Sequence, residues 1–232
     1  DVFLRDTLAG TTELVSVNSS GVQGNGVSGS AASERTMSAD GRYVVFWSNA
    51  TNLISGDTNG TTDIFLRDRF LGITSRVSIS SSGIQANGNS DDYSVTPDGR
   101  FIAFRSTSTN LVTPSNTVAQ IYVRDTEFGL TTCISTNGSG TQATMAAQHP
   151  SISADGMYVV FSSGASNLVS GDTNSAIDVF VKNRVAGTVS RVSVNGSGQQ
   201  GNSSSDSPCI SESGQYVSFT SSSSNLVTGD TN

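Results

Sequence analysis

Apolar and polar residues alternate along this chain in short stretches, which is the pattern of β-strands with one buried face. Residues 74–80 (TSRVSIS) form one such stretch. Residues 101–104 (FIAF) are apolar at every position, and such a run predicts a strand that is covered on both faces. Apolar residues do not recur at the 3.6-residue period of a helix in any window. The pattern therefore predicts an all-β protein without helices.

The same pattern of strands and turns occurs four times. An Asn-Leu-(Val/Ile) sequence recurs at intervals of 58, 57 and 58 residues, at Asn52, Asn110, Asn167 and Asn225. Turn glycines recur at the same intervals, at Gly41, Gly99, Gly156 and Gly214. A repeat of this length is typical of solenoids and propellers.

One repeat contains four short strands. In the second repeat these strands are residues 63–68, 74–80, 93–96 and 101–104, and Pro97-Asp98-Gly99 forms a tight turn before the last of them. Short connections make neighbouring strands antiparallel, and four-stranded units repeated about an axis are the blades of a β-propeller. We therefore predict a single propeller domain, with repeats at approximately 1–62, 63–119, 120–177 and 178–232.

Two segments of each repeat resemble a known family. Residues 95–104 (VTPDGRFIAF) are similar to the "SPDG-x-x-IAF" signature of the WD40-like PD40 repeats in TolB-like propellers. Residues 63–68 (DIFLRD) are similar to the "iyv-x-D" strand of the same repeat. The resemblance covers the whole chain, although the fourth copy has Glu212-Ser213-Gly214 at the turn. It implies a propeller fold and a role in protein–protein contacts.

The repeat register leaves the number of blades open. Residues 1–6 match the third strand of a blade, and residues 225–232 follow a second strand. The chain could close as a four-bladed ring with one shared blade. Alternatively, it is a segment of a larger propeller within a longer chain, or two copies associate as half-rings in a homodimer. Because TolB-like rings usually have six blades, we favour a segment or a half-ring.

Acidic turns in two repeats suggest a calcium site. The candidate ligands lie at matching spacings and are Asp57, Asn59 and Asp63, and Asp172, Asn174 and Asp178. Calcium prefers six to eight oxygen ligands, and three such side chains supply part of that set. The alternative is an ordinary turn, because Asp, Asn and Gly are common turn residues. No acidic residue follows at the twelfth position, where an EF-hand loop has its bidentate ligand.

A glutamine recurs in the loops that lead into each first strand. These residues are Gln23, Gln85, Gln142 and Gln200. Loops at equivalent positions lie at the same end of a propeller, so their amides are candidates for binding a sugar or a peptide. The alternative is that each amide braces the backbone of its own loop.

Charge and the rarer residue types exclude several functions. The net charge of −7 and the absence of a Lys/Arg stripe disfavour nucleic acid and anionic membranes. The chain has no apolar run of the roughly 20 residues that span a bilayer, so we expect no membrane insertion. Cys133 and Cys209 occupy different repeat positions, so we expect no disulfide. The single histidine, His149, cannot build a histidine metal cluster, and we expect it to be structural or exposed.

These observations lead to a functional hypothesis. We expect a non-catalytic binding or structural propeller that mediates protein–protein contacts, with calcium as the only candidate cofactor. The polar, weakly charged composition favours a bacterial protein of the cell surface, the periplasm or the extracellular space. One alternative is a lectin-like propeller that binds carbohydrate. Another is part of a hydrolase whose catalytic residues lie elsewhere.

Overall fold

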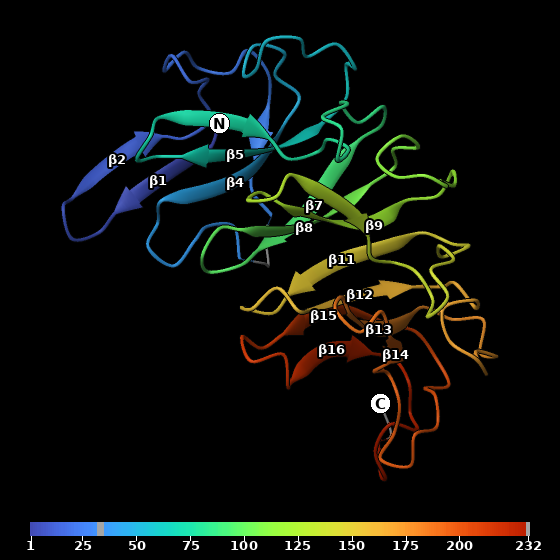
Figure 1. Ribbon diagram of the computed structural model, residues 1–232. Coiled ribbons are helices and arrows are strands. Elements are labelled where there is room, and N and C mark those ends of the chain that lie inside the picture. Colours follow the sequence, from blue (N-terminus) through green and yellow to red (C-terminus); the bar gives the residue numbers. More distant parts are fainter. Residues whose placement is uncertain (32–34, 231–232) are drawn as a thin grey trace.

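The computed structural model describes residues 1–31 and 35–230, and within them the chain consists of strands, turns and loops without a helix (Figure 1). The predicted all-β propeller class is confirmed. No helix in this part of the chain is long and apolar enough to cross a membrane.

In residues 1–31 and 35–230, sixteen strands form five antiparallel sheets, each with its strands in sequence order. Three sheets are complete blades of four strands: β3 (Ser28–Gly29), β4 (Tyr43–Ser48), β5 (Asp63–Asp68) and β6 (Ile73–Arg76); β7 (Ser90–Val95), β8 (Phe101–Ser106), β9 (Gln120–Asp125) and β10 (Leu130–Cys133); β11 (Ala147–Ile152), β12 (Tyr158–Ser163), β13 (Asp178–Asn183) and β14 (Val189–Arg191). Two sheets are half-blades: β1 (Phe3–Asp6) with β2 (Thr11–Leu14), and β15 (Ser205–Ile210) with β16 (Val217–Ser221). Each complete blade thus takes two strands from one sequence repeat and two from the next.

The blades follow one another in an arc. Strands β7, β11 and β15 lie next to one another along its inner side (Figure 1). The two half-blades lie at opposite ends of the arc and form separate sheets (Figure 1). The described residues therefore do not form a four-bladed ring that closes through one shared blade.

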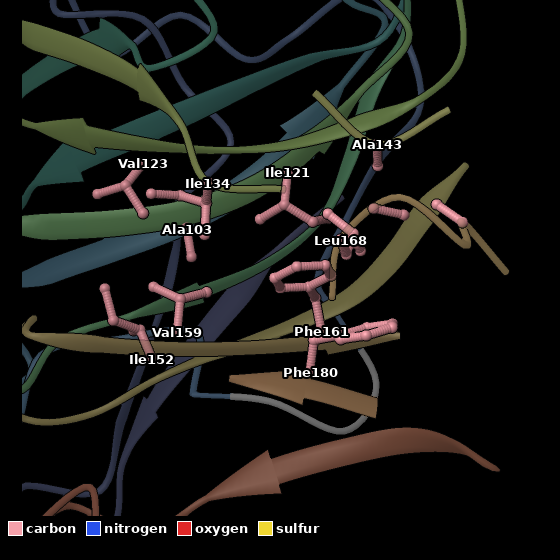
Figure 2. Close-up of a cluster of buried hydrophobic side chains, with 12 residues drawn as sticks. Ala103, Ile121, Val123, Ile134, Ala143, Ile152, Val159, Phe161, Leu168 and Phe180 are labelled. Atoms are coloured by element: carbon pink, nitrogen blue, oxygen red, sulfur yellow. The ribbon is translucent and has the colours of Figure 1, made fainter. Parts of the chain in front are cut away.

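The apolar strands form the core between neighbouring blades. Figure 2 shows Ala103, Ile121 and Val123 of the second complete blade facing Val159 and Phe161 of the third. Within each complete blade an aromatic pair also joins the second and third strands, with ring centroids 5.6–5.8 Å apart: Phe46 with Phe65, Phe104 with Tyr122, and Phe161 with Phe180. Burial on both faces confirms the interpretation of the continuously apolar runs.

The tight turn between the first and second strands also contributes to blade packing. Gly99 has a φ of +76°, a conformation that favours glycine. A Cβ at this position would overlap the ring of Tyr43 in the preceding blade. Asp98 fixes the turn by accepting a hydrogen bond from the backbone N–H of Arg100 at 3.0 Å. In the fourth copy Ser213 makes the equivalent contact at 3.4 Å, which is a weaker brace.

Candidate binding site at the inner strands

The inner strands β7, β11 and β15 share an irregularity at one repeat position. Their pairing shifts register between Asp91 and Tyr93, between Gln148 and Ser151, and between Asp206 and Cys209. The residues at these bulges, Asp92, His149 and Ser207, have φ values of 43°, 53° and 52°. Positive φ is uncommon outside glycine, and bulges redirect side chains next to binding sites. The bulges therefore mark the inner strands as a candidate site.

Hydrogen bonds connect the three bulges into one cluster. The backbone N–H of His149 donates to Asp92 Oδ2 at 2.9 Å. The ring Nδ1 of His149 lies 2.8 Å from Asp206 Oδ1. The hydroxyl of Ser162 donates to the same carboxylate oxygen at 2.6 Å. We call Asp91, Asp92, His149 and Asp206 the inner acidic cluster.

The inner acidic cluster is accessible and carries excess negative charge. The side chains of Asp91, His149 and Asp206 are 42%, 41% and 31% exposed. The cluster also has one ion-paired arginine, Arg105, whose Nη1 lies 2.7 Å from Asp91 Oδ1. Three carboxyl groups therefore face one guanidinium and one imidazole.

The carboxyl groups differ in how readily they hold their charge. Burial raises the pKa of Asp92, because a low-dielectric environment disfavours the charged form. Burial is also the largest effect on Asp206 and by itself would raise its pKa. Hydrogen bonds from Ser162, from the backbone of Ser207 and from His149 together outweigh burial, so the pKa of Asp206 is below its usual value. Asp206 therefore keeps its negative charge more firmly than Asp92.

Sequence reasoning missed this cluster, although a signal was present. Two consecutive polar residues interrupt each inner strand, at Asp91-Asp92, Gln148-His149 and Asp206-Ser207. These pairs recur at the repeat spacing and therefore occupy equivalent positions. We considered His149 alone and did not compare it with Asp92 and Ser207. His149 is half-exposed, as expected, but it belongs to a hydrogen-bonded cluster.

The predicted calcium ligands of the first complete blade surround an arginine. Arg76 Nη2 lies 3.0 Å from Asp57 Oδ2, and its Nε lies 3.3 Å from Asp63 Oδ2. Asn59 donates its side-chain amide to Asp63 at 3.0 Å, so it presents nitrogen to that carboxylate. Ser78 donates to the other oxygen of Asp63 at 2.6 Å. The guanidinium occupies the position at which we predicted the cation.

The third complete blade repeats this arrangement. Arg191 lies 3.2 Å from Asp172 and 3.3 Å from Asp178, and Asn174 donates to Asp178 at 3.3 Å. The described residues contain no group of three or more His, Cys, Asp or Glu side chains arranged to hold a metal ion. The structure thus brings the predicted residues together around an arginine. Calcium binding stays a prediction, and it would require the guanidinium to move.

The four recurring glutamines do not meet in a shared pocket. Each side-chain amide donates to the turn that precedes the third strand of the preceding blade, which its loop leaves: Gln23 to Asp1 at 2.7 Å, Gln85 to Asp57 at 2.9 Å, Gln142 to the carbonyl of Pro114 at 2.9 Å, and Gln200 to Thr173 at 3.0 Å. These acceptors lie in a different turn and three of them are side-chain oxygens, so the amides connect two loops and do not brace the backbone of their own loop. Ligand binding by these residues stays a prediction.

Both cysteines are free thiols. Burial raises the pKa of Cys133 to about 11, so this thiol is protonated and unreactive at neutral pH.

Comparison with known proteins places the fold. No family model matches this chain, and no curated protein sequence matches it. TolB from Acinetobacter baumannii is similar in structure, with a TM-score of 0.52 and 21% identity over 93% of this chain and 41% of that chain. An oligogalacturonate lyase from Vibrio parahaemolyticus is also similar, with a TM-score of 0.55 and 12% identity over 97% of this chain and 54% of that one. A prolyl endopeptidase has a TM-score of 0.50 and 11% identity over 84% of this chain and 26% of its own length.

These likenesses define the class of protein as a β-propeller with a TolB-like fold. The resemblance of the sequence repeats to the PD40 repeats of TolB-like propellers is confirmed at the level of the fold. The chain spans 41% of that TolB and about half of the lyase, and both proteins are less than 25% identical to it. Fold alone does not define function, because one fold supports many activities.

Proposed function

We propose that this chain is a non-catalytic binding module whose inner acidic cluster holds a cationic side chain of a protein partner. The observation that carries this proposal is the Asp206 carboxylate, which is 31% exposed, lies 2.8 Å from His149 Nδ1 and has a lowered pKa. A partner lysine or arginine would form a charge-assisted hydrogen bond with it.

The geometry of Asp206 favours a ligand at one of its two oxygens. Oδ1 already accepts hydrogen bonds from Ser162 at 2.6 Å and from the backbone N–H of Ser207 at 2.7 Å. Oδ2 has a long contact of 3.5 Å with the amide of Gln148. Oδ1 therefore fixes the orientation of the carboxylate and leaves Oδ2 available. A preorganised acceptor loses little entropy when it binds.

The charge of the whole chain supports a basic partner. A net charge of −7 attracts cationic surfaces and accelerates their association. It disfavours an oligogalacturonate, which is polyanionic, at the inner acidic cluster. For this reason we favour a protein ligand over the carbohydrate that the sequence left as an alternative. The likeness to a bacterial TolB supports a bacterial setting, and we assign the module to the periplasm or to the outside of the cell.

Isothermal titration with tetralysine tests the proposal. We expect Asp206→Asn to weaken binding by about tenfold, which corresponds to the loss of one charge-assisted contact. Asp1→Asn is the matched control, because it makes the same substitution at an exposed carboxylate next to β1, in the half-blade at the opposite end of the arc. Equal affinities of Asp206→Asn and wild type would overturn the assignment of the site.

The same titration separates the alternatives. Binding of a neutral oligosaccharide such as cellohexaose, unchanged in Asp206→Asn, would favour the lectin-like reading. Hydrolytic activity that disappears in His149→Ala would contradict a non-catalytic module.

A further inference from the structure

The turns between the third and fourth strands have the same construction in all four copies. At the first position a side-chain oxygen accepts hydrogen bonds at 2.8–3.2 Å from two backbone N–H groups of the turn, and this residue is Asp6, Asp68, Asp125 or Asn183. Four residues later a glycine has a φ between 66° and 71°: Gly10, Gly72, Gly129 or Gly187. These two residues suffice to fix the turn.

Each of these turns presents a large apolar side chain to solvent. Leu8 is 99% exposed, Phe70 82%, Phe128 65% and Val185 80%. The turn geometry does not need these residues, since the capping oxygen and the glycine define it. Leu71 and Leu130 extend the exposed apolar surface beside two of these turns, at 58% and 51% exposure. We call Leu8, Phe70, Phe128 and Val185 the apolar rim.

Topology brings the apolar rim to one end of the molecule. Strands within every sheet are antiparallel and follow sequence order, so all connections between third and fourth strands lie at the same end of the blades. Successive blades follow the arc in Figure 1, and the four side chains therefore follow one edge of that end. A row of exposed apolar residues marks an interaction surface.

Charged residues of both signs surround the apolar rim, with carboxylates in excess. Arg69 directly precedes Phe70 and pairs with Glu13, and Arg184 directly precedes Val185. The Arg42 guanidinium lies 5.4 Å from the ring centroid of Phe70, but it also pairs with Asp68 at 2.7 Å. Arg100 is likewise 4.9 Å from the ring centroid of Phe128 and pairs with Asp125 at 2.9 Å. In each of these pairs the two charges neutralise each other, so the pairs themselves add no net charge beside the two aromatic residues.

The turns between first and second strands lie at the same end and add further carboxylates. These residues are Asp40, Asp98 and Asp155. An apolar row on an acidic background repels anionic lipid and attracts a basic apolar surface.

We propose that the apolar rim is a second docking surface, and that its occupant is a protein segment carrying apolar side chains interspersed with lysine or arginine. A hollow of about 500 Å³ lined by Asp40, Arg42, Arg69 and Phe70 receives one apolar side chain of that segment against the Phe70 ring, between one carboxylate and two guanidinium groups. This proposal does not depend on the inner acidic cluster, since the two surfaces share no residue.

The test uses an amphipathic peptide of leucine and lysine, with a peptide in which serine replaces leucine as its partner control. Fluorescence anisotropy measures binding to wild type and to the variant Leu8→Ser/Phe70→Ser/Phe128→Ser/Val185→Ser. We expect the variant to bind the leucine peptide at least about tenfold more weakly, because several buried apolar contacts are lost. Wild type should prefer the leucine peptide to the serine peptide.

A matched variant controls for general loss of apolar surface. Val22→Ser/Ile84→Ser removes two side chains of 55% and 57% exposure from the loops at the other end of the blades, and it should bind like wild type. Circular dichroism confirms that each variant folds. Equal binding by the rim variant and wild type would overturn the proposal.

Two further results would also overturn it. One is rim-dependent binding to phosphatidylglycerol vesicles without an effect on the peptide, which would assign the rim to a membrane. The other is rim-dependent dimerisation in sedimentation velocity without an effect on the peptide, which would assign it to a second copy of the chain. Asp206→Asn should leave the effect of the rim variant unchanged.

Discussion

At Arg76, a guanidinium lies between two carboxylates that are almost completely withdrawn from water. The side chains of Arg76, Asp57 and Asp63 are 7%, 5% and 0% exposed. Removing the one positive charge leaves two buried negative charges without compensation. Breaking a buried ion pair in this way is strongly destabilising.

We therefore expect Arg76→Met to lower the free energy of unfolding by about 3 kcal/mol, measured by urea denaturation. The triple variant Arg76→Met/Asp57→Asn/Asp63→Asn is the control, because it removes the two charges as well. It should be more stable than the single variant. Wild-type stability in Arg76→Met would contradict the ion-pair account.

The sequence predicted that Asp57 and Asp63 lie close together, but not that Arg76 pairs with both of them. Asp57 and Asp63 are close because one short turn separates them, and such spacing is visible in a sequence. Arg76 follows on a different strand, and its approach depends on the pairing of β5 with β6. One signal was available in the sequence. The two repeats that have both aspartates also have arginine at the position of Arg76, whereas the repeat with Gln120 in place of the second aspartate has Cys133 there.

The lowered pKa of Asp206 has a consequence for acid stability. A carboxyl group whose pKa is lower in the folded state stabilises the fold above its unfolded pKa, and this contribution is lost as the pH falls through the folded value. As the pH falls from about 5 into the acid range, wild type should therefore lose more stability than Asp206→Asn. Thermal unfolding of both proteins across this range measures the difference. Parallel losses would show that Asp206 has the same pKa in both states.

At the scale of strands and turns, packing between blades depends on glycines at the turn. Gly41 and Gly99 occupy equivalent positions and have similar φ values of 69° and 76°. A Cβ at Gly41 would approach only the flexible end of Arg69, at 3.5 Å, whereas a Cβ at Gly99 would overlap the ring of Tyr43. The two positions share backbone strain and differ in packing.

Alanine substitution separates these two effects. Gly41→Ala should cost about 1 kcal/mol from the left-handed backbone conformation. Gly99→Ala should cost a further 1–3 kcal/mol or so, because the blade interface is overpacked. Chemical denaturation of both variants measures the difference. Equal losses would mean that Tyr43 moves aside without cost.

The alternating pattern predicted the strands well and their irregularities poorly. Residues 101–104 and their equivalents are apolar because both faces are covered, and this is readable from the sequence. The bulges at Asp92, His149 and Ser207 are not, because a two-residue period contains no position for an extra residue. The candidate site was missed for this reason, since its side chains lie at those bulges.

At the scale of the whole molecule, the repeat specifies the blade but not the curvature of the arc. Each repeat supplies half of two blades, so the pattern was compatible with a closed ring, a half-ring or a segment. The separation of the half-blades β1–β2 and β15–β16 depends on the angle between blade faces. That angle is set by interlocking side chains such as those in Figure 2, which the pattern does not describe.

His149 provides the most direct measurement of the central claim, that the inner acidic cluster binds a cationic side chain. It is the only histidine, so the Hε1 proton of its imidazole gives one NMR signal that cannot be confused with that of another residue. Its Nδ1 lies 2.8 Å from Asp206, the proposed acceptor. Titration of the protein with tetralysine should shift this signal progressively and in parallel with the calorimetric binding curve, and the shift should disappear in Asp206→Asn. An unchanged His149 signal at saturating tetralysine would place the binding elsewhere and contradict the account.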